Sequence, residues 1–166
     1  VNSAKRERVV SKIVWALRML GLENLDPSSM DFKIAVQKVA YLLQAIEGID
    51  LGIEFRWLSR GPYSRYLANL YGVIAKKLVD GELVLEEDMI KLRNLIMRVQ
   101  EAVPIKDKVL LLEMISSLAM MCRDVYPSPQ DPVAELAKRK PYFDRVAVVK
   151  IWRILSDLGI CSSSVS

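Results

Sequence analysis

The chain has 166 residues, a formal net charge of +4 and 52% hydrophobic residues. This length suits one domain with a sizeable core, and the apolar content excludes global disorder. No apolar run reaches the ~18 residues of a membrane span, and the charged N-terminal residues do not match a signal peptide, so we expect a cytoplasmic protein.

Helical periodicity predicts two helices in the first third of the chain. Apolar residues recur at helical spacing over residues 4–20, and Gly21 ends this pattern. A second helix is expected from an N-cap at Ser29 or Asp31 to about Glu47. Either side chain can accept hydrogen bonds from the N–H groups that the first turn leaves unpaired.

The periodicity then changes from helical to alternating. Residues 53–58 alternate apolar and other side chains, which predicts a short strand with one half-buried face. Gly61 and Pro62 punctuate the chain after it. Residues 82–85 also favour a strand that could pair with the first one, which predicts a small two-stranded antiparallel element, winged-helix-like, near 53–85.

Five further helices are predicted from the rest of the chain. The first of them opens at Tyr63 or Ser64 and closes at Asp80. The other four are expected at residues 87–102, at 106–125, from 132 to about 140 after an N-cap at Asp131, and at 145–158 after an N-cap at Asp144. The expected fold is therefore mainly α, with about seven helices in one domain over residues 1–160 and a disordered Ser-rich tail over residues 161–166.

Histidine is absent from the chain, which removes the commonest general base and the usual partner of Ser or Cys nucleophiles. There is no Gly-rich phosphate loop and no paired-carboxylate motif. The two cysteines, Cys122 and Cys161, fall short of the four ligands of a structural zinc site. We therefore expect no enzyme activity, no cofactor and no metal, and we expect Cys122 to be a small buried hydrophobic residue.

Basic residues are unevenly distributed along the chain. The segment from Phe55 to Val79 carries a net charge of +5 and no acidic residue, and residues 138–153 carry another +5. Clustered cations attract phosphate backbones and anionic partners. The alternative is a solvated helix face whose charges pair with acids from elsewhere in the fold.

The turn at residues 60–64 joins the predicted strand to the next helix. It is either only a well-formed turn or a surface that presents Arg60, Tyr63 and Arg65 at a helix N-terminus, where anions are favoured. Aromatic residues around it could stack bases, although such residues more often fill a core. The candidate binding residues are Arg56, Arg60, Tyr63, Ser64, Arg65, Lys76 and Lys77.

Two sequence segments together form a longer pattern. A Gln-Lys-x-x-Tyr segment within residues 36–44 is followed by Phe55, Trp57, Leu58 and the Arg-Gly-Pro-Tyr-Ser segment at 60–64. This pattern resembles the Panacea (SocA-like) antitoxin domains and is closer to a related, largely archaeal family of predicted transcriptional regulators. Residues 112–118, 133–138 and 140–143 fit the second family, so the resemblance spans about residues 32–160.

The resemblance implies a binding module without an accepted catalytic residue. Panacea-type domains neutralise partner toxins or present a partner to a protease, so the first hypothesis is a non-enzymatic regulatory or antitoxin-like module with a protein partner. The alternative is a nucleic-acid-binding transcriptional regulator, in which the third helix and the strand after it form a helix-turn-helix-like element. An unrecognised enzyme ranks last, and no membrane partner is expected.

Overall fold

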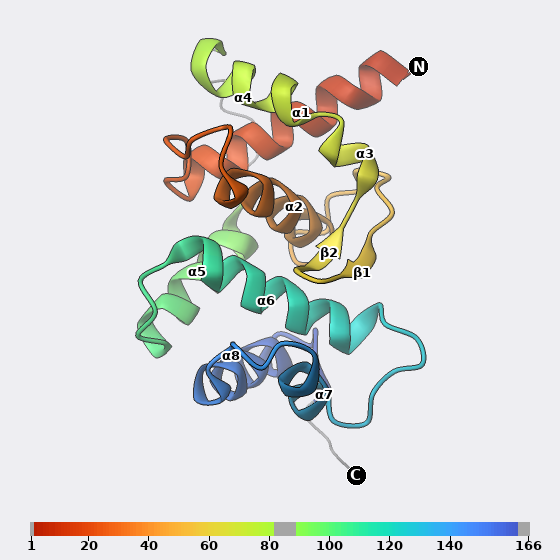
Figure 1. Ribbon diagram of the computed structural model, residues 1–166, viewed down its shortest axis with the longest axis vertical. Helices are drawn as coiled ribbons and strands as arrows, with labels where there is room; N and C mark the ends of the chain where they lie inside the picture. The colour runs from red at the N-terminus through yellow and green to blue at the C-terminus, as the bar shows by residue number, and fades with distance from the viewer. Residues whose placement is uncertain (1, 82–88, 163–166) are drawn as a thin grey trace.

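The computed structural model describes residues 2–81 and 89–162. Within these ranges the chain forms eight helices and one two-stranded antiparallel sheet, which confirms the predicted mainly α fold with a small β element (Figure 1). In chain order the elements are α1 (Asn2–Met19), α2 (Met30–Ala45), β1 (Arg56–Leu58), β2 (Gly61–Tyr63), α3 (Arg65–Ala68), α4 (Tyr71–Asp80), α5 (Ile90–Ala102), α6 (Lys108–Arg123), α7 (Pro132–Arg139) and α8 (Arg145–Asp157).

Helix α6 lies in the middle of the molecule. It contacts α2 on one side and α7 and α8 on the other, while α1 and α4 lie beyond α2 (Figure 1). The β1–β2 hairpin packs against both α2 and α6. Helix α6 is buried along most of its length, and this burial includes the polar residues Glu113, Ser116 and Ser117. A carboxylate is rarely buried unless it is paired, so Glu113 marks a place where other polar groups must converge.

Three helix starts follow the predicted capping chemistry. The side chains of Ser29, Asp131 and Asp144 each accept a hydrogen bond from the backbone N–H three residues later, at 3.1–3.2 Å. These bonds satisfy N–H groups that a helix start leaves without an intrahelical partner. The structure thus selects Ser29 rather than Asp31 as the cap of α2.

The strand prediction needs a correction. The ladder of β1 covers only residues 56–58, and its partner is β2, in which Gly61 and Pro62 pair with Leu58 and Trp57. These two residues therefore belong to a strand, although the sequence suggested only a break. Proline is tolerated because it lies in a short edge strand. The predicted strand at 82–85, the proposed wing, lies outside the described residues.

The third predicted helix is two helices. Helix α3 is a single turn capped by Ser64, and α4 begins at Tyr71. Between them the N–H of Leu70 donates to the carbonyl of Leu67, a tighter bond than that of an α-helix. Because α3 has only four residues, the turn at residues 60–64 leads into a single helical turn and not into the start of a long helix.

The predictions for the cysteines and the tail also change. Cys122 forms a disulfide with Cys161, with 5.1 Å between their Cα atoms, so it is not a free hydrophobic residue. Cys161 is buried, so the folded domain extends past residue 160. Residues 163–166 of the predicted tail lie outside the described part of the chain. Among the described helices, none combines the length and apolar character that crossing a bilayer requires.

Candidate functional site

An amide side chain of α2 binds the chain at the end of the β1–β2 hairpin. Gln37, which is buried, accepts a hydrogen bond from the N–H of Ser64 at 2.7 Å and donates to the carbonyl of the same residue at 2.8 Å. It also donates to the hydroxyl of Tyr71 at 2.9 Å. The amide thus takes the place of a neighbouring strand for the end of β2, and it satisfies backbone groups that could not be buried unpaired.

The next residue of α2 binds the same strand. Lys38 is 1% exposed, and its Nζ donates to the carbonyl of Pro62 at 2.7 Å. Burial, together with the nearby charges of Lys140 and Arg60, lowers the pKa of Lys38 to about 7, although the carboxylate of Glu113 opposes the shift. Gln37 and Lys38 therefore fix Pro62 of β2 and Ser64, which follows β2, to α2.

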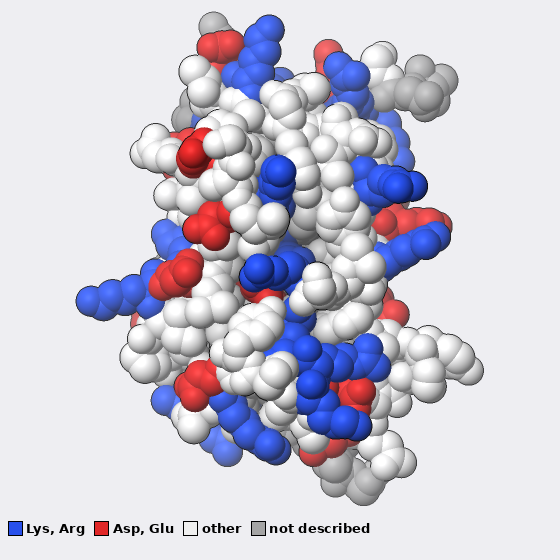
Figure 2. Space-filling model, in the orientation of Figure 1, with Lys and Arg blue, Asp and Glu red and all other residues white. Residues whose placement is uncertain are grey.

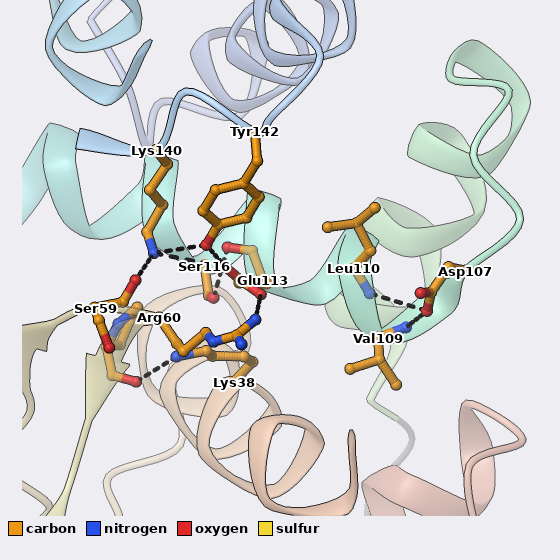
Figure 3. Close-up of polar contacts among 11 residues, drawn as sticks. Lys38, Ser59, Arg60, Asp107, Val109, Leu110, Glu113, Ser116, Lys140 and Tyr142 are labelled. Atoms are coloured by element: carbon orange, nitrogen blue, oxygen red, sulfur yellow. Dashed lines mark hydrogen bonds and ion pairs between the residues drawn. The ribbon is translucent and has the colours of Figure 1, made fainter. Parts of the chain in front are cut away.

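A buried carboxylate of α6 completes the support (Figure 3). Glu113 accepts a hydrogen bond from the hydroxyl of Tyr142 and lies 3.5 Å from Nζ of Lys140 and 3.8 Å from a guanidinium nitrogen of Arg60. Lys140 also donates to the backbone carbonyl of Ser59 in the hairpin turn. Desolvation lowers the pKa of Lys140 and, with the Glu113 hydrogen bond, raises the pKa of Tyr142.

The hairpin touches α6 through a glycine. Gly61 has a φ of +89°, and a Cβ atom at this position would lie 2.3 Å from Oγ of Ser117. Glycine is therefore required both for the backbone conformation and for the close approach. Together with the bonds of Lys38 and Lys140, this contact makes the hairpin a rigid platform.

One face of this platform is an open hollow of ≈820 Å³, which we call the α3 hollow. The candidate residues Arg56, Tyr63, Ser64 and Arg65 all line it. Arg56 and Arg65 are exposed and Tyr63 is half-buried, whereas Ser64 is buried, its hydroxyl capping α3 and its backbone bound to Gln37. The hollow is completed by Lys5, Gly52, Ile53, Glu54, Leu58 and Tyr66.

Arg60 lies at a second hollow of ≈390 Å³ between the hairpin, α2 and α4, which we call the α2 hollow. Leu58 and Tyr63 line both hollows, so the hairpin separates them. The other residues of the α2 hollow are Met30, Lys33, Ile34, Gln37, Lys38, Ser59 and Tyr71.

The last two candidate residues do not join this site. Lys76 is exposed on α4, and Lys77 donates to the hydroxyl of Ser11 on α1 at 3.2 Å. Neither lines the α2 or the α3 hollow. The structure thus gathers five of the seven predicted residues around the hairpin and leaves this pair on another surface.

The two basic segments of the sequence meet at Trp57 of β1. The guanidinium carbon of Arg139 lies 5.8 Å from the centre of its ring, and Nζ of Lys140 lies 5.6 Å from it. In the view of Figure 2, basic side chains lie over the hairpin side of the molecule and over the end of α7. Part of this charge is compensated within the fold, since Arg139 pairs with Glu135 at 3.0 Å.

Sequence reasoning missed the groups that hold the site together. Gln37 and Lys38 were noted only as part of the Gln-Lys-x-x-Tyr segment and not as residues of the site. Glu113, Lys140 and Tyr142 were not recognised as one cluster. The sequence carried no signal that set Gln37 and Lys38 apart, because the complete burial of residues 34–43 of α2, where they lie, is seen only in the structure. Polar residues on every side of a fully buried helix must have partners.

Comparisons of the chain with protein-family models, with curated proteins and with solved structures find no match. The resemblance to the Panacea domains and to the related regulators therefore stays a prediction. The function has to be argued from the hairpin and the two hollows beside it.

Proposed function

We propose that this chain is a non-enzymatic regulatory or antitoxin-like module that binds a protein partner through the α3 hollow. The observation that carries the proposal is a concave face, rich in Arg and Tyr, on a hairpin whose backbone is tied down by buried side chains. Arg and Tyr are the residues most often found at interface hot spots. A backbone fixed before binding has little conformational freedom left to lose, which favours affinity.

The composition of the α3 hollow fits this role. Arg56 and Arg65 are exposed, and Lys5 lies 5.0 Å from the ring centre of Tyr66 and donates to the carbonyl of Gly52 at 2.9 Å. Three cations thus face one carboxylate among the lining residues. A partner with an acidic surface and apolar groups for the exposed Tyr66 ring would be complementary in charge and chemistry.

The test is partner capture with charge-reversed variants. The tagged chain is expressed in its native cells, and the lysate is treated with nuclease before capture. We expect a set of proteins that survives nuclease treatment and is lost with the double variant Arg56→Glu/Arg65→Glu. The control Lys76→Glu/Arg145→Glu makes the same change in net charge at exposed residues outside both hollows and should retain the partners. Equal capture by all three proteins would reject the α3 hollow as the interface.

The second candidate function is nucleic-acid binding, favoured by the same exposed cations beside two tyrosines. Duplex or single-stranded binding would weaken steeply as salt rises, because counterions are released from the phosphates. Tyr63 and Tyr66 could then stack bases. Captured material that disappears on nuclease treatment, with salt-dependent binding to a purified duplex, would replace the first proposal with this one.

A cytoplasmic location is part of the proposal, and the redox state of the Cys122–Cys161 disulfide in cells provides a test of it. Disulfides persist in oxidising compartments and in the cytosol of hyperthermophiles but are rare in other cytosolic proteins. Acid quenching of intact cells followed by maleimide labelling measures the fraction of Cys122 and Cys161 that is oxidised. Fractionation of the same cells locates the chain directly.

A further inference from the structure

The α2 hollow combines apolar walls with a basic rim. Met30 and Leu58 are large apolar residues at its mouth, 58% and 47% exposed, and Ile34 and Tyr71 lie behind them. Its volume of ≈390 Å³ falls within the range of about 300–1,000 Å³ that is usual for ligand pockets. An aliphatic side chain placed here would cover exposed apolar surface on both sides.

The charge around this hollow is unbalanced. Lys33, Lys38 and Arg60 line it, and no Asp or Glu is among the described lining residues. Behind Arg60, the carboxylate of Glu113 is already engaged by Tyr142 and by Lys140 at 3.5 Å. The hollow therefore presents the positive charges of Lys33 and Arg60, and Arg60 shares the carboxylate of Glu113 with Lys140.

Arg60 in particular has donors to spare. Its closest approach to Glu113 is 3.8 Å, longer than a hydrogen bond, and its side chain is 56% exposed. A guanidinium group offers five N–H donors in a planar arrangement that matches a carboxylate in bidentate fashion. A carboxylate supplied from outside could thus bind Arg60 without displacing its internal partner.

We propose that the α2 hollow binds an acidic segment of the protein partner, which inserts one aliphatic side chain between Met30 and Leu58 and places a carboxylate on Arg60. A second carboxylate nearby would face Lys33. This inference rests on the proposed function, since it specifies which kind of segment the partner brings. The basic rim requires acidic groups in the occupant, and the exposed Met30 and Leu58 require an apolar side chain. A basic segment would not match the rim, and a purely apolar segment would leave its charges without a partner carboxylate.

Selection from a random 12-residue peptide display library on the immobilised full chain tests the inference. We expect enrichment of peptides with Asp or Glu within a few residues of Leu, Ile or Met. The most enriched peptide, labelled with a fluorophore, is then titrated against wild type, Met30→Glu, Lys33→Glu and Arg60→Gln. Each variant should bind at least about tenfold more weakly, and binding should weaken with salt.

The variants are chosen so that folding is preserved. Met30 and Lys33 lie in the first turn of α2, where an acidic side chain is favourable to the helix dipole. The matched controls Val146→Glu and Arg145→Glu make the same changes at exposed positions in the first turn of α8 and should bind like wild type. Circular dichroism and thermal midpoints verify that all five variants are folded.

The possible outcomes separate this inference from the proposed function. Absence of acidic, aliphatic peptides among the enriched clones, or equal binding by the α2-hollow variants and the controls, overturns the inference. If Met30→Glu/Lys33→Glu still captures the cellular partner while Arg56→Glu/Arg65→Glu does not, the inference is wrong and the proposed function stands. Loss of the partner in both double variants, with retention in the controls, supports both.

Discussion

The side-chain amide of Gln37 pairs with both backbone groups of Ser64, and Gln44, two turns further along α2, pairs in the same way with Ile53. Two glutamines seven residues apart on one helix therefore clamp both ends of the segment that contains the hairpin. Between Ile53 and Ser64 the chain pairs with itself over the three residue pairs of the β1–β2 ladder. The platform on which both hollows lie thus depends on side chains of α2 as much as on its own ladder.

Replacement of Gln37 should reveal this dependence. In Gln37→Leu the N–H of Ser64 remains buried without the partner that Gln37 supplied, whereas its carbonyl keeps the bond from the N–H of Ala68. One such buried group costs about 1–3 kcal/mol, and we expect a loss of this size in the free energy of unfolding, measured by urea denaturation. Gln44 is only half-buried, so water can replace it, and Gln44→Leu should cost about 1 kcal/mol or less. Equal losses in the free energy of unfolding for Gln37→Leu and Gln44→Leu would contradict the expectation that the more deeply buried glutamine contributes more.

The contact between Gly61 and α6 gives a second prediction. Gly61→Ala requires a left-handed backbone with a Cβ and places that atom against Oγ of Ser117, so we expect a loss of about 2–4 kcal/mol. Gly72→Ala on α4 is the matched control, because no described atom beyond its chain neighbours and the nearby backbone of its own helix lies within 4 Å of the added Cβ. It should be neutral or gain up to about 1 kcal/mol.

Ser117 separates the two causes of that loss. Its Oγ is buried and has no hydrogen-bond partner among the described residues, so Ser117→Ala alone should be neutral or slightly stabilising. Combined with Gly61→Ala it should recover the part of the loss that comes from the clash and leave the part that comes from the backbone. A double variant no more stable than Gly61→Ala would assign the whole effect to backbone conformation.

The disulfide is expected to make a large contribution to stability. It closes a segment with a sequence separation of 39, for which the loop-entropy model gives about 4 kcal/mol. Cys122→Ser/Cys161→Ser should lower the free energy of unfolding by about 3–4 kcal/mol, and reductant should lower the thermal midpoint of wild type but leave that of the double variant unchanged. A reductant effect of the same size on both proteins would contradict this account.

The helices and their caps could be predicted because they are local. Ser29, Asp131 and Asp144 precede apolar periodic segments by a fixed number of residues, and nothing distant is needed to interpret them. The partner of β1 is different, since Gly61 and Pro62 break most secondary structures. In the fold, two residues more than twenty positions earlier hold this strand: Lys38 donates to the carbonyl of Pro62, and Gln37 accepts a hydrogen bond from the N–H of Ser64.

The residues of the candidate site likewise fall into two groups, those that local sequence identifies and those whose role depends on distant contacts. Arg56 and Arg65 could be found from charge alone, because an exposed cation needs no partner to be recognised. Lys38, Glu113 and Lys140 could not, because a charged residue in a sequence is by default on the surface. These three residues are buried because α2, α6 and the residue after α7 pack together around the hairpin turn. Neither the periodicity of the sequence nor the spacing of its residues predicts this packing. The pairing of two cysteines likewise depends on the distance between them in the fold.

Lys38 gives the last prediction, on the dependence of stability on pH. Its pKa is lowered from the model-compound value of 10.5 to about 7 by burial, so between these pH values the unfolded chain binds more protons than the native chain. Stability must then rise with pH across this window, because folding releases the proton of Lys38 and this release becomes less costly as the pH rises. Lys140, whose pKa is also lowered, acts in the same direction.

The contribution of Lys38 is isolated by a difference curve. The free energies of unfolding of wild type and Lys38→Met are measured in urea at pH 6.5, 8 and 9.5, and the effect of Lys140 cancels to first order in the difference. We expect wild type to gain about 3 kcal/mol relative to Lys38→Met between the first and last pH, at 1.36 kcal/mol per pH unit over the part of the window covered. The upper limit stays below the ionisation of Tyr41 and Tyr142, whose pKa values burial raises. A flat difference would mean that Lys38 keeps an ordinary pKa, and hence that water reaches its Nζ in spite of the hydrogen bond to Pro62.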